Sequence, residues 1–134
     1  MTRIESPHAL AGRLAFLRIA VGLTLTLAPR PVLRTQTADE PSGPFVLMTR
    51  TVGIRDFVVG VGSASAIRSN NRDDVRRWLI VGLLSDLFDI AAAVVSARSI
   101  GRRSAVVAAL VPVPVVAADI QALRRLHADP STTH

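Results

Sequence analysis

The sequence predicts an all-α fold, a polytopic membrane protein in which four transmembrane helices form one bundle. Three observations predict this class. The chain of 134 residues is 49% hydrophobic and only 19% charged, whereas charged residues make up about 25% of an average soluble domain. Its mean hydropathy is positive, at +0.39. Four apolar stretches each approach the ~20 residues that a helix needs to cross a bilayer.

We expect residues 1–134 to form a single integral membrane domain, because this length suits one domain. The third and fourth apolar stretches are the least interrupted by charge, whereas the first contains Arg13 and Arg18 and the second contains Arg50, Arg55 and Asp56. The predicted spans cover residues 11–28, 45–67, 78–97 and 104–123.

We interpret the first stretch as a retained span; the alternative is a cleaved secretory signal. Arginines lie within its apolar part, and Ala28 is followed by Pro29 and Arg30, which do not form a cleavage site of the A-x-A type. A signal peptide would carry its positive charge before the apolar run. The retained interpretation therefore fits the pattern better.

The connection over residues 29–44 is predicted to be a long proline-rich loop. Its prolines lack the backbone N–H that a helix interior needs, so we expect them to break any helix there. They are Pro29, Pro31, Pro41 and Pro44. The third connection is predicted to be a tight turn around Gly101.

The remaining boundaries are assigned from caps, aromatics and prolines. Asn71, Asp73 and Asp74 are candidate N-caps for the third helix, and Trp78 falls where interfacial aromatic residues collect. Pro112 and Pro114 are expected to bend the fourth helix, and residues 124–134 to form a polar tail.

Orientation follows from the arginines that flank the spans. Nine arginines lie on the side of the two termini and seven on the other side, which predicts a bacterial inner membrane protein with both termini in the cytoplasm. The short, doubly basic turn at Arg102 and Arg103 argues against this orientation.

Charged residues inside the predicted spans are the candidate site. An ionised side chain at the centre of a bilayer costs roughly 2.5–3.5 kcal/mol on insertion scales, so each requires a partner, water or a function. Because alternate spans run antiparallel, these charges fall in the same half of the membrane. The predicted buried polar network consists of Arg18, Arg55, Asp56, Asp86, Asp89 and Asp119.

Small residues share a helix face with these charges in every span. Small side chains let helix backbones approach closely in lipid, where packing drives association. We therefore expect these faces to meet in the middle of the bundle. The predicted packing glycines are Gly22, Gly53, Gly60, Gly62 and Gly82.

Three interpretations of the polar network remain open at this point. It is a structural set of ion pairs that fixes helix register, a proton relay or ion-coupled site, or a polar pocket for a ligand headgroup. We expect Asp119 at the rim of the bundle. Two arginines then face three deeper aspartates, which leaves one carboxylate in excess, and desolvation favours its protonated form.

The second span carries a motif of the pattern R-x-x-G-x-R-D-x-x-x-G, which runs from Arg50 to Gly60. In this motif the chain resembles a family of small four-span bacterial and fungal membrane proteins of unknown function, within the broader DoxX-like four-helix group. The resemblance covers roughly residues 14–123, and an aspartate in the third span, Asp86 or Asp89, fits it. It implies the architecture alone, since the family has no agreed activity. The long proline-rich loop departs from the family.

Several kinds of site are not expected. The chain has no cysteine, and its three histidines, His8, His127 and His134, lie near the two ends. We therefore expect no catalytic residues, no cofactor and no metal. The arginines flank apolar spans, which favours membrane lipids as partners and argues against nucleic acid.

These features predict a small accessory or assembly subunit, not an enzyme, within a larger bacterial envelope complex. Its partners would be larger membrane proteins or further copies of the chain, and its setting an assembly that transports lipid or another apolar cargo. The alternative is a stand-alone or homo-oligomeric carrier, or a proton-linked membrane enzyme, that uses the buried aspartates Asp56, Asp86 and Asp89.

Overall fold

The computed structural model describes residues 7–35, 40–96, 98, 106 and 109–128. This part of the chain is helical and contains no strand, which confirms the all-α class for it. The helices are α1 (Pro7–Leu27), α2 (Pro29–Arg34), α3 (Gly43–Arg68), α4 (Arg72–Val95) and α7 (Val113–Ala128).

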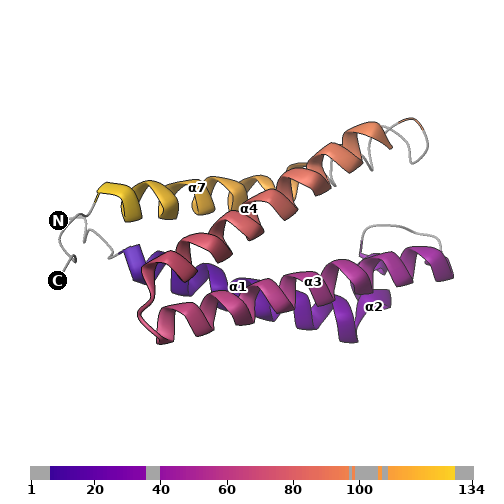
Figure 1. Ribbon diagram of the computed structural model, residues 1–134. Coiled ribbons are helices and arrows are strands. Elements are labelled where there is room, and N and C mark those ends of the chain that lie inside the picture. Colours follow the sequence, from indigo (N-terminus) through magenta and orange to yellow (C-terminus); the bar gives the residue numbers. More distant parts are fainter. Residues whose placement is uncertain (1–6, 36–39, 97, 99–105, 107–108, 129–134) are drawn as a thin grey trace, which may run out of the picture.

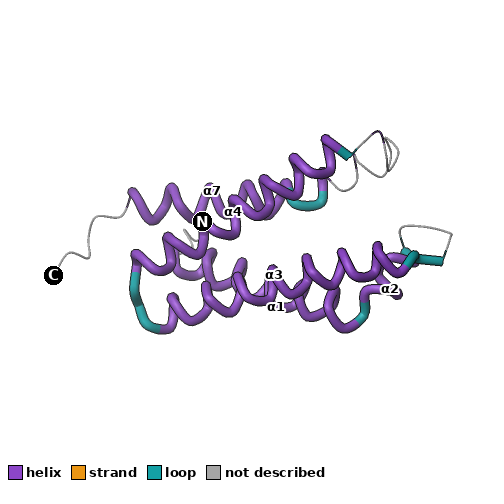
Figure 2. Tube along the Cα trace, turned by 45° about the vertical axis from the view of Figure 1, so that its right-hand side comes forward, coloured by secondary structure: helices purple, strands orange, loops and turns teal. Residues whose placement is uncertain are grey.

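The four longer helices form two pairs. α1 lies along α3, which is its most extensive contact, and α4 lies along α7. The pairs are close together at the end that holds the connection between α3 and α4. They separate toward the other end, where the last turns of α4 lie apart from α3 (Figures 1 and 2).

Glycines allow α1 and α3 to touch along their backbones. A Cβ atom added to Gly53 would lie 2.8 Å from the carbonyl oxygen of Gly22, and one added to Gly60 would lie 2.8 Å from the backbone nitrogen of Ile19. Real Cβ atoms do not approach so closely, so any side chain here would push the helices apart. Gly62 similarly lies against the Trp78 ring of α4.

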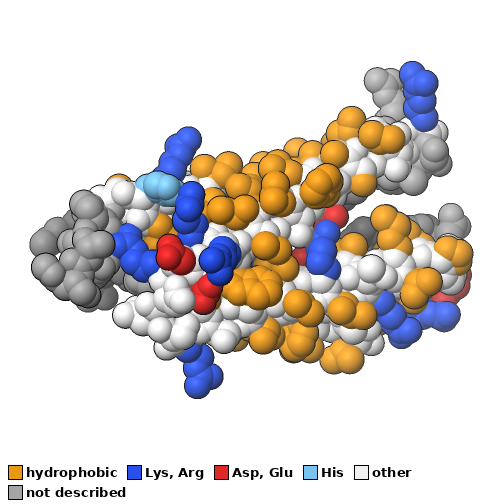
Figure 3. Space-filling view, in the orientation of Figure 1, with side chains coloured by type: hydrophobic (Ala, Val, Ile, Leu, Met, Phe, Trp, Pro, Cys, Tyr) orange, Lys and Arg blue, Asp and Glu red, His pale blue; other side chains and the backbone are white. Residues whose placement is uncertain are grey.

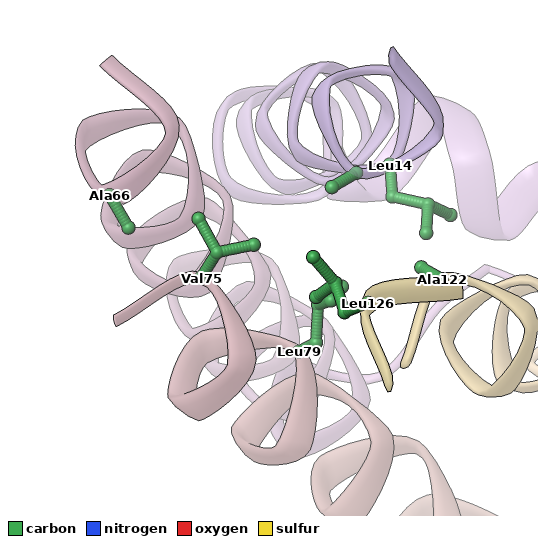
Figure 4. Packing of buried hydrophobic residues seen from close by; sticks show 7 residues of the cluster. Leu14, Ala66, Val75, Leu79, Ala122 and Leu126 are labelled. Atoms are coloured by element: carbon green, nitrogen blue, oxygen red, sulfur yellow. The ribbon is translucent and has the colours of Figure 1, made fainter. Parts of the chain in front are cut away.

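A hydrophobic core joins all four long helices near the connection between α3 and α4. Its buried members are Ala11 and Leu14 of α1, Ala66 of α3, Val75 and Leu79 of α4, and Ala122 and Leu126 of α7; six of them are labelled in Figure 4. Every member is less than a tenth exposed. This core fixes the end of the bundle at which the two helix pairs are closest.

Residues 29–34 form a helix, so the prediction of a continuous loop over residues 29–44 is wrong there. Pro29 and Pro31 both lie in the first turn of α2. The first backbone N–H groups of a helix have no acceptor within it, and the fixed φ of proline suits this position. The two prolines therefore begin a short helix.

At Pro112 and Pro114, where a bend of the fourth helix was predicted, the helix is interrupted completely, between the helical residues 109–110 and α7. A turn occupies residues 111–112, and α7 begins directly after it, with Pro114 in its first turn. The carbonyl of Pro112 accepts hydrogen bonds from the backbone N–H groups of Val115 and Val116 at 3.0 and 2.9 Å. The prolines thus start a helix, for the same reason as in α2.

The predicted polar tail begins five residues too early, because residues 124–128 continue α7 as helix. Residues 129–134 lie outside the described residues, as does the predicted turn around Gly101. Consequently Asp119 lies well inside a helix that ends at Ala128.

Among the three candidate N-caps of α4, Asn71 is the residue that caps the helix. Its side-chain oxygen accepts hydrogen bonds from the backbone N–H groups of Asp73 and Asp74, at 3.1 and 3.2 Å. Asp73 and Asp74 occupy the first turn, where their negative charge complements the helix dipole. Asn70, just before the cap, has a positive φ of 51°, a conformation that asparagine tolerates well.

Among the described residues, two helical stretches are long and apolar enough to cross a membrane, Ala9–Leu27 and Arg72–Val95. They correspond to the first and third predicted spans. α3 has 26 residues but carries Arg50, Arg55 and Asp56. α7 has 16 residues, fewer than the ~20 that span a bilayer.

Candidate functional site: a buried ion-pair network

Arg18 lies at the centre of the polar interior. It is 5% exposed. Its Nη2 donates a hydrogen bond to Asp86 Oδ2 of α4 at 2.6 Å and to Asp119 Oδ2 of α7 at 2.8 Å. Its Nη1 donates to Asp86 Oδ1 at 3.4 Å. One guanidinium therefore connects three helices, and its planar set of donors suits this bidentate contact.

A glycine on α4 makes room for this guanidinium. A Cβ added to Gly82 would lie 2.8 Å from Arg18 Nη2 and 3.1 Å from Arg18 Cζ. Gly82 precedes Asp86 by four residues, so both face the same side of α4. The missing side chain of Gly82 therefore leaves room for the guanidinium beside the Asp86 carboxylate.

Arg55 of α3 forms the second centre of the network. Its Nη1 and Nη2 donate hydrogen bonds to the two carboxylate oxygens of Asp89, each at 2.7 Å. Its Nη2 also donates to Asp56 Oδ1 at 3.0 Å. The Arg55 and Asp89 side chains are 29% and 32% exposed, so this pair lies nearer the surface than Arg18.

Asp56 links the two centres. Its Oδ1 lies 3.0 Å from Arg55 Nη2 and 3.7 Å from Arg18 Nη1. The structure thus brings together all six charged residues that the sequence singled out, from α1, α3, α4 and α7. Residue spacing within each helix could not have revealed which arginine binds which aspartate, because the pairing depends on how the helices are placed relative to one another.

One of the six lies deeper than expected. Asp119 was expected at the rim, but it is 1% exposed. The reason is that α7 extends beyond residue 123, so Asp119 is in the middle of this helix and shares its buried face with Ala122 and Leu126. The expected rim position of Asp119 is therefore wrong, because the helix continues to Ala128.

The network contains more carboxylates than guanidinium groups. Asp56, Asp86, Asp89 and Asp119 face only Arg18 and Arg55 within it. The two oxygens of Asp119 also differ, because Oδ2 accepts from Arg18 whereas Oδ1 is buried without a hydrogen-bond partner among the described residues. A buried polar atom without a partner requires an explanation.

Sequence reasoning missed one polar contact that helps to close the bundle. Arg72 Nη2, at the start of α4, donates a hydrogen bond to the Leu126 carbonyl of α7 at 2.6 Å. A basic side chain suits the last carbonyls of a helix, but Arg72 and Leu126 are distant in sequence, so no local spacing could have indicated the contact. Ser63, in contrast, donates to the Val59 carbonyl at 2.8 Å, within its own helix.

The chemistry available to this arrangement is ion pairing and proton binding. In the described part of the chain, no group of three or more histidine, cysteine, aspartate or glutamate side chains is placed to hold a metal ion. Breaking a buried ion pair by removing one partner costs about 3–5 kcal/mol, so the network ties the helices firmly. No protein-family model, curated protein or solved structure matches this chain.

Proposed function

We propose that this chain is a small accessory or assembly subunit of a larger complex in a bacterial inner membrane. We further propose that α1, α3, α4 and α7 all belong to membrane spans and that both termini are cytoplasmic. The observation that carries the proposal is the distribution of side chains. Six charged groups from four helices bind one another inside, while many large apolar side chains face outward.

The apolar exterior extends over three helices. On α1, Phe16 is 73% exposed; on α4, Phe88 is 73% and Val95 is 83% exposed; on α3, Leu47 is 66% exposed. Figure 3 shows such side chains along most of the visible face. An exposed apolar surface of this kind favours a lipid or protein environment over water.

Arg55 and Asp56 of α3 are compatible with a span because they are paired, whereas Arg50 lies on the exposed surface of the helix. Arg55 and Asp56 take part in the network, which offsets the cost of placing them in a bilayer. At a rise of about 1.5 Å per residue, the 26 residues of α3 are long enough to cross it. For α7 the proposal requires residues before Val113 to complete the span.

The accessory function is proposed because the outer helix faces remain available for contact with other proteins. Ion pairs and close glycine contacts occupy the interior, so the outer helix faces are the surface available to larger membrane proteins or to further copies of the chain. A complex that transports lipid or another apolar cargo would suit such a surface. The resemblance to DoxX-like four-helix proteins adds an expected architecture to this proposal and no activity.

The test is purification of the tagged full chain from its native membranes. We expect the chain to remain in membranes after alkaline carbonate extraction. When it is purified in mild detergent without crosslinker, we expect mass spectrometry to identify a larger membrane protein in a stoichiometric amount. Release by carbonate would contradict the membrane proposal. Recovery of the chain alone would contradict the subunit proposal and favour a carrier or proton-linked enzyme.

Two matched variants locate the partner. Phe16→Ala on α1 and Phe88→Ala on α4 remove side chains of equal exposure from different helices and leave the ion pairs intact. A variant that keeps its folded amount but loses the partner identifies the helix face at which the partner binds.

A further inference from the structure

Asp119 differs from the other carboxylates of the network. Asp86 and Asp89 each use both oxygens, on Arg18 and Arg55 respectively. Asp56 lies between the two guanidinium groups and its side chain is 13% exposed. Asp119 is 1% exposed and uses a single oxygen, so it receives the least compensation for its burial.

Asp119 also shares its donor with a competitor. Arg18 Nη2 donates to Asp86 Oδ2 at 2.6 Å and to Asp119 Oδ2 at 2.8 Å. Two ionised carboxylates beside one nitrogen atom repel each other. Two charged groups face Asp119 from the helices packed against α7: Arg18 on α1 and Asp86 on α4. The other charged groups of the network, Asp56, Arg55 and Asp89, lie beyond these two.

A proton on Asp119 resolves both difficulties. In a neutral carboxylic acid, Oδ2 remains an acceptor for Arg18 while Oδ1 carries the hydrogen. A buried neutral group without a partner costs far less than a buried charge without one. The excess of carboxylate over guanidinium in the network falls from two to one.

We propose that Asp119 is a proton-binding site, which takes up a proton at Oδ1 from solvent and returns it to solvent. The orphaned oxygen favours a proton over a metal ion, because the described residues hold no group of metal-ligating side chains around it. Loss of the proton places a second full negative charge beside Arg18 Nη2 and Asp86. Deprotonation strengthens the attraction to Arg18 but adds repulsion between Asp119 and Asp86 and leaves a buried charge with an unpartnered oxygen. It therefore weakens the packing of α7 against α4.

This proposal separates two substitutions that both remove a carboxylate from Arg18. Asp119→Asn replaces the acid with a neutral group of the same shape, so we expect the purified full chain in detergent to fold like the wild type at mildly acidic pH. Asp86→Asn removes the bidentate partner of Arg18. We expect its ratio of folded to unfolded protein to fall on the order of 1,000-fold, as for a broken buried pair.

Infrared spectroscopy tests the proton directly. We expect the wild type at mildly acidic pH to show the C=O stretch of a protonated carboxylic acid, and Asp119→Asn to abolish this band. The control is Asp73→Asn, which removes an exposed carboxylate and should retain the band. Because the neutral form fits the folded state, wild-type stability should fall as pH rises through deprotonation, and the D119N protein should lack this fall.

Three results would overturn the proposal. They are a wild type without the band, a band that persists in the D119N protein, and a D119N protein that fails to fold although the D73N protein folds. The last result would show that the negative charge of Asp119 is itself required.

Discussion

The guanidinium of Arg18 is shared by carboxylates from α4 and α7 and lies 3.7 Å from one on α3. The need for partners was predictable at this scale, because an arginine inside an apolar helix is costly when unpaired. Which partners it takes was not predictable. Asp86 and Asp89 are three residues apart and share a helix face, so only the relative rotation and height of the helices assign one to Arg18 and the other to Arg55.

The empty position at Gly82 provides a test at the scale of one methyl group. In Gly82→Ala the new Cβ would lie 2.8 Å from Arg18 Nη2, so the guanidinium must move away from Asp86. We expect destabilisation of about 1–3 kcal/mol, which is typical of overpacking, measured by denaturant titration in micelles.

The matched control is Gly12→Ala in α1, where an added Cβ meets nothing within 4 Å. Replacing a helical glycine by alanine should stabilise by about 0.5–1 kcal/mol. If the two variants changed stability in the same direction and by the same amount, Gly82 would have no role in seating Arg18.

At the scale of elements, apolar length predicted the bounds of α1 and α3 within four residues, whereas α4 begins six residues before the predicted span. The prolines that begin α2 were misread as part of a loop. A proline disrupts the interior of a helix yet suits its first turn. The spacing of the prolines in the sequence does not tell whether they interrupt a helix or begin one. Both α2 and α7 begin with proline in the first turn, and the misplaced end of α7 produced the error in the depth of Asp119.

Capping provides a test at this scale, because α3 and α4 begin differently. The Asn71 side chain caps α4 with two hydrogen bonds, whereas Ser42, at the N-cap of α3, makes no side-chain hydrogen bond there. We expect Asn71→Ala to cost about 1 kcal/mol and Ser42→Ala to cost almost nothing, both measured by thermal unfolding. Equal losses in the two variants would contradict the assignment of Asn71 as the cap.

At the scale of the whole molecule, a hydrophobic core closes one end, ion pairs occupy the interior beyond it, and large apolar side chains face outward. The sequence predicted the helical class and the candidate polar residues because both depend on composition and on helical spacing. It could not predict the pairing of α1 with α3 or the separation of the helix pairs at one end. Both depend on contacts between distant residues, such as those of Gly22 with Gly53.

The central claim is that ion pairs between helices hold this bundle together, and an exchange of charge between α3 and α4 tests it most directly. Arg55→Asp places three carboxylates together, and Asp89→Arg places two guanidinium groups together, so each single variant should yield much less folded protein. The double variant restores opposite charges across the same contact. We expect its folded amount, measured by size-exclusion chromatography and helical circular dichroism, to exceed that of both single variants. Single variants that fold like the wild type, or a double variant that folds no better than they do, would contradict the claim.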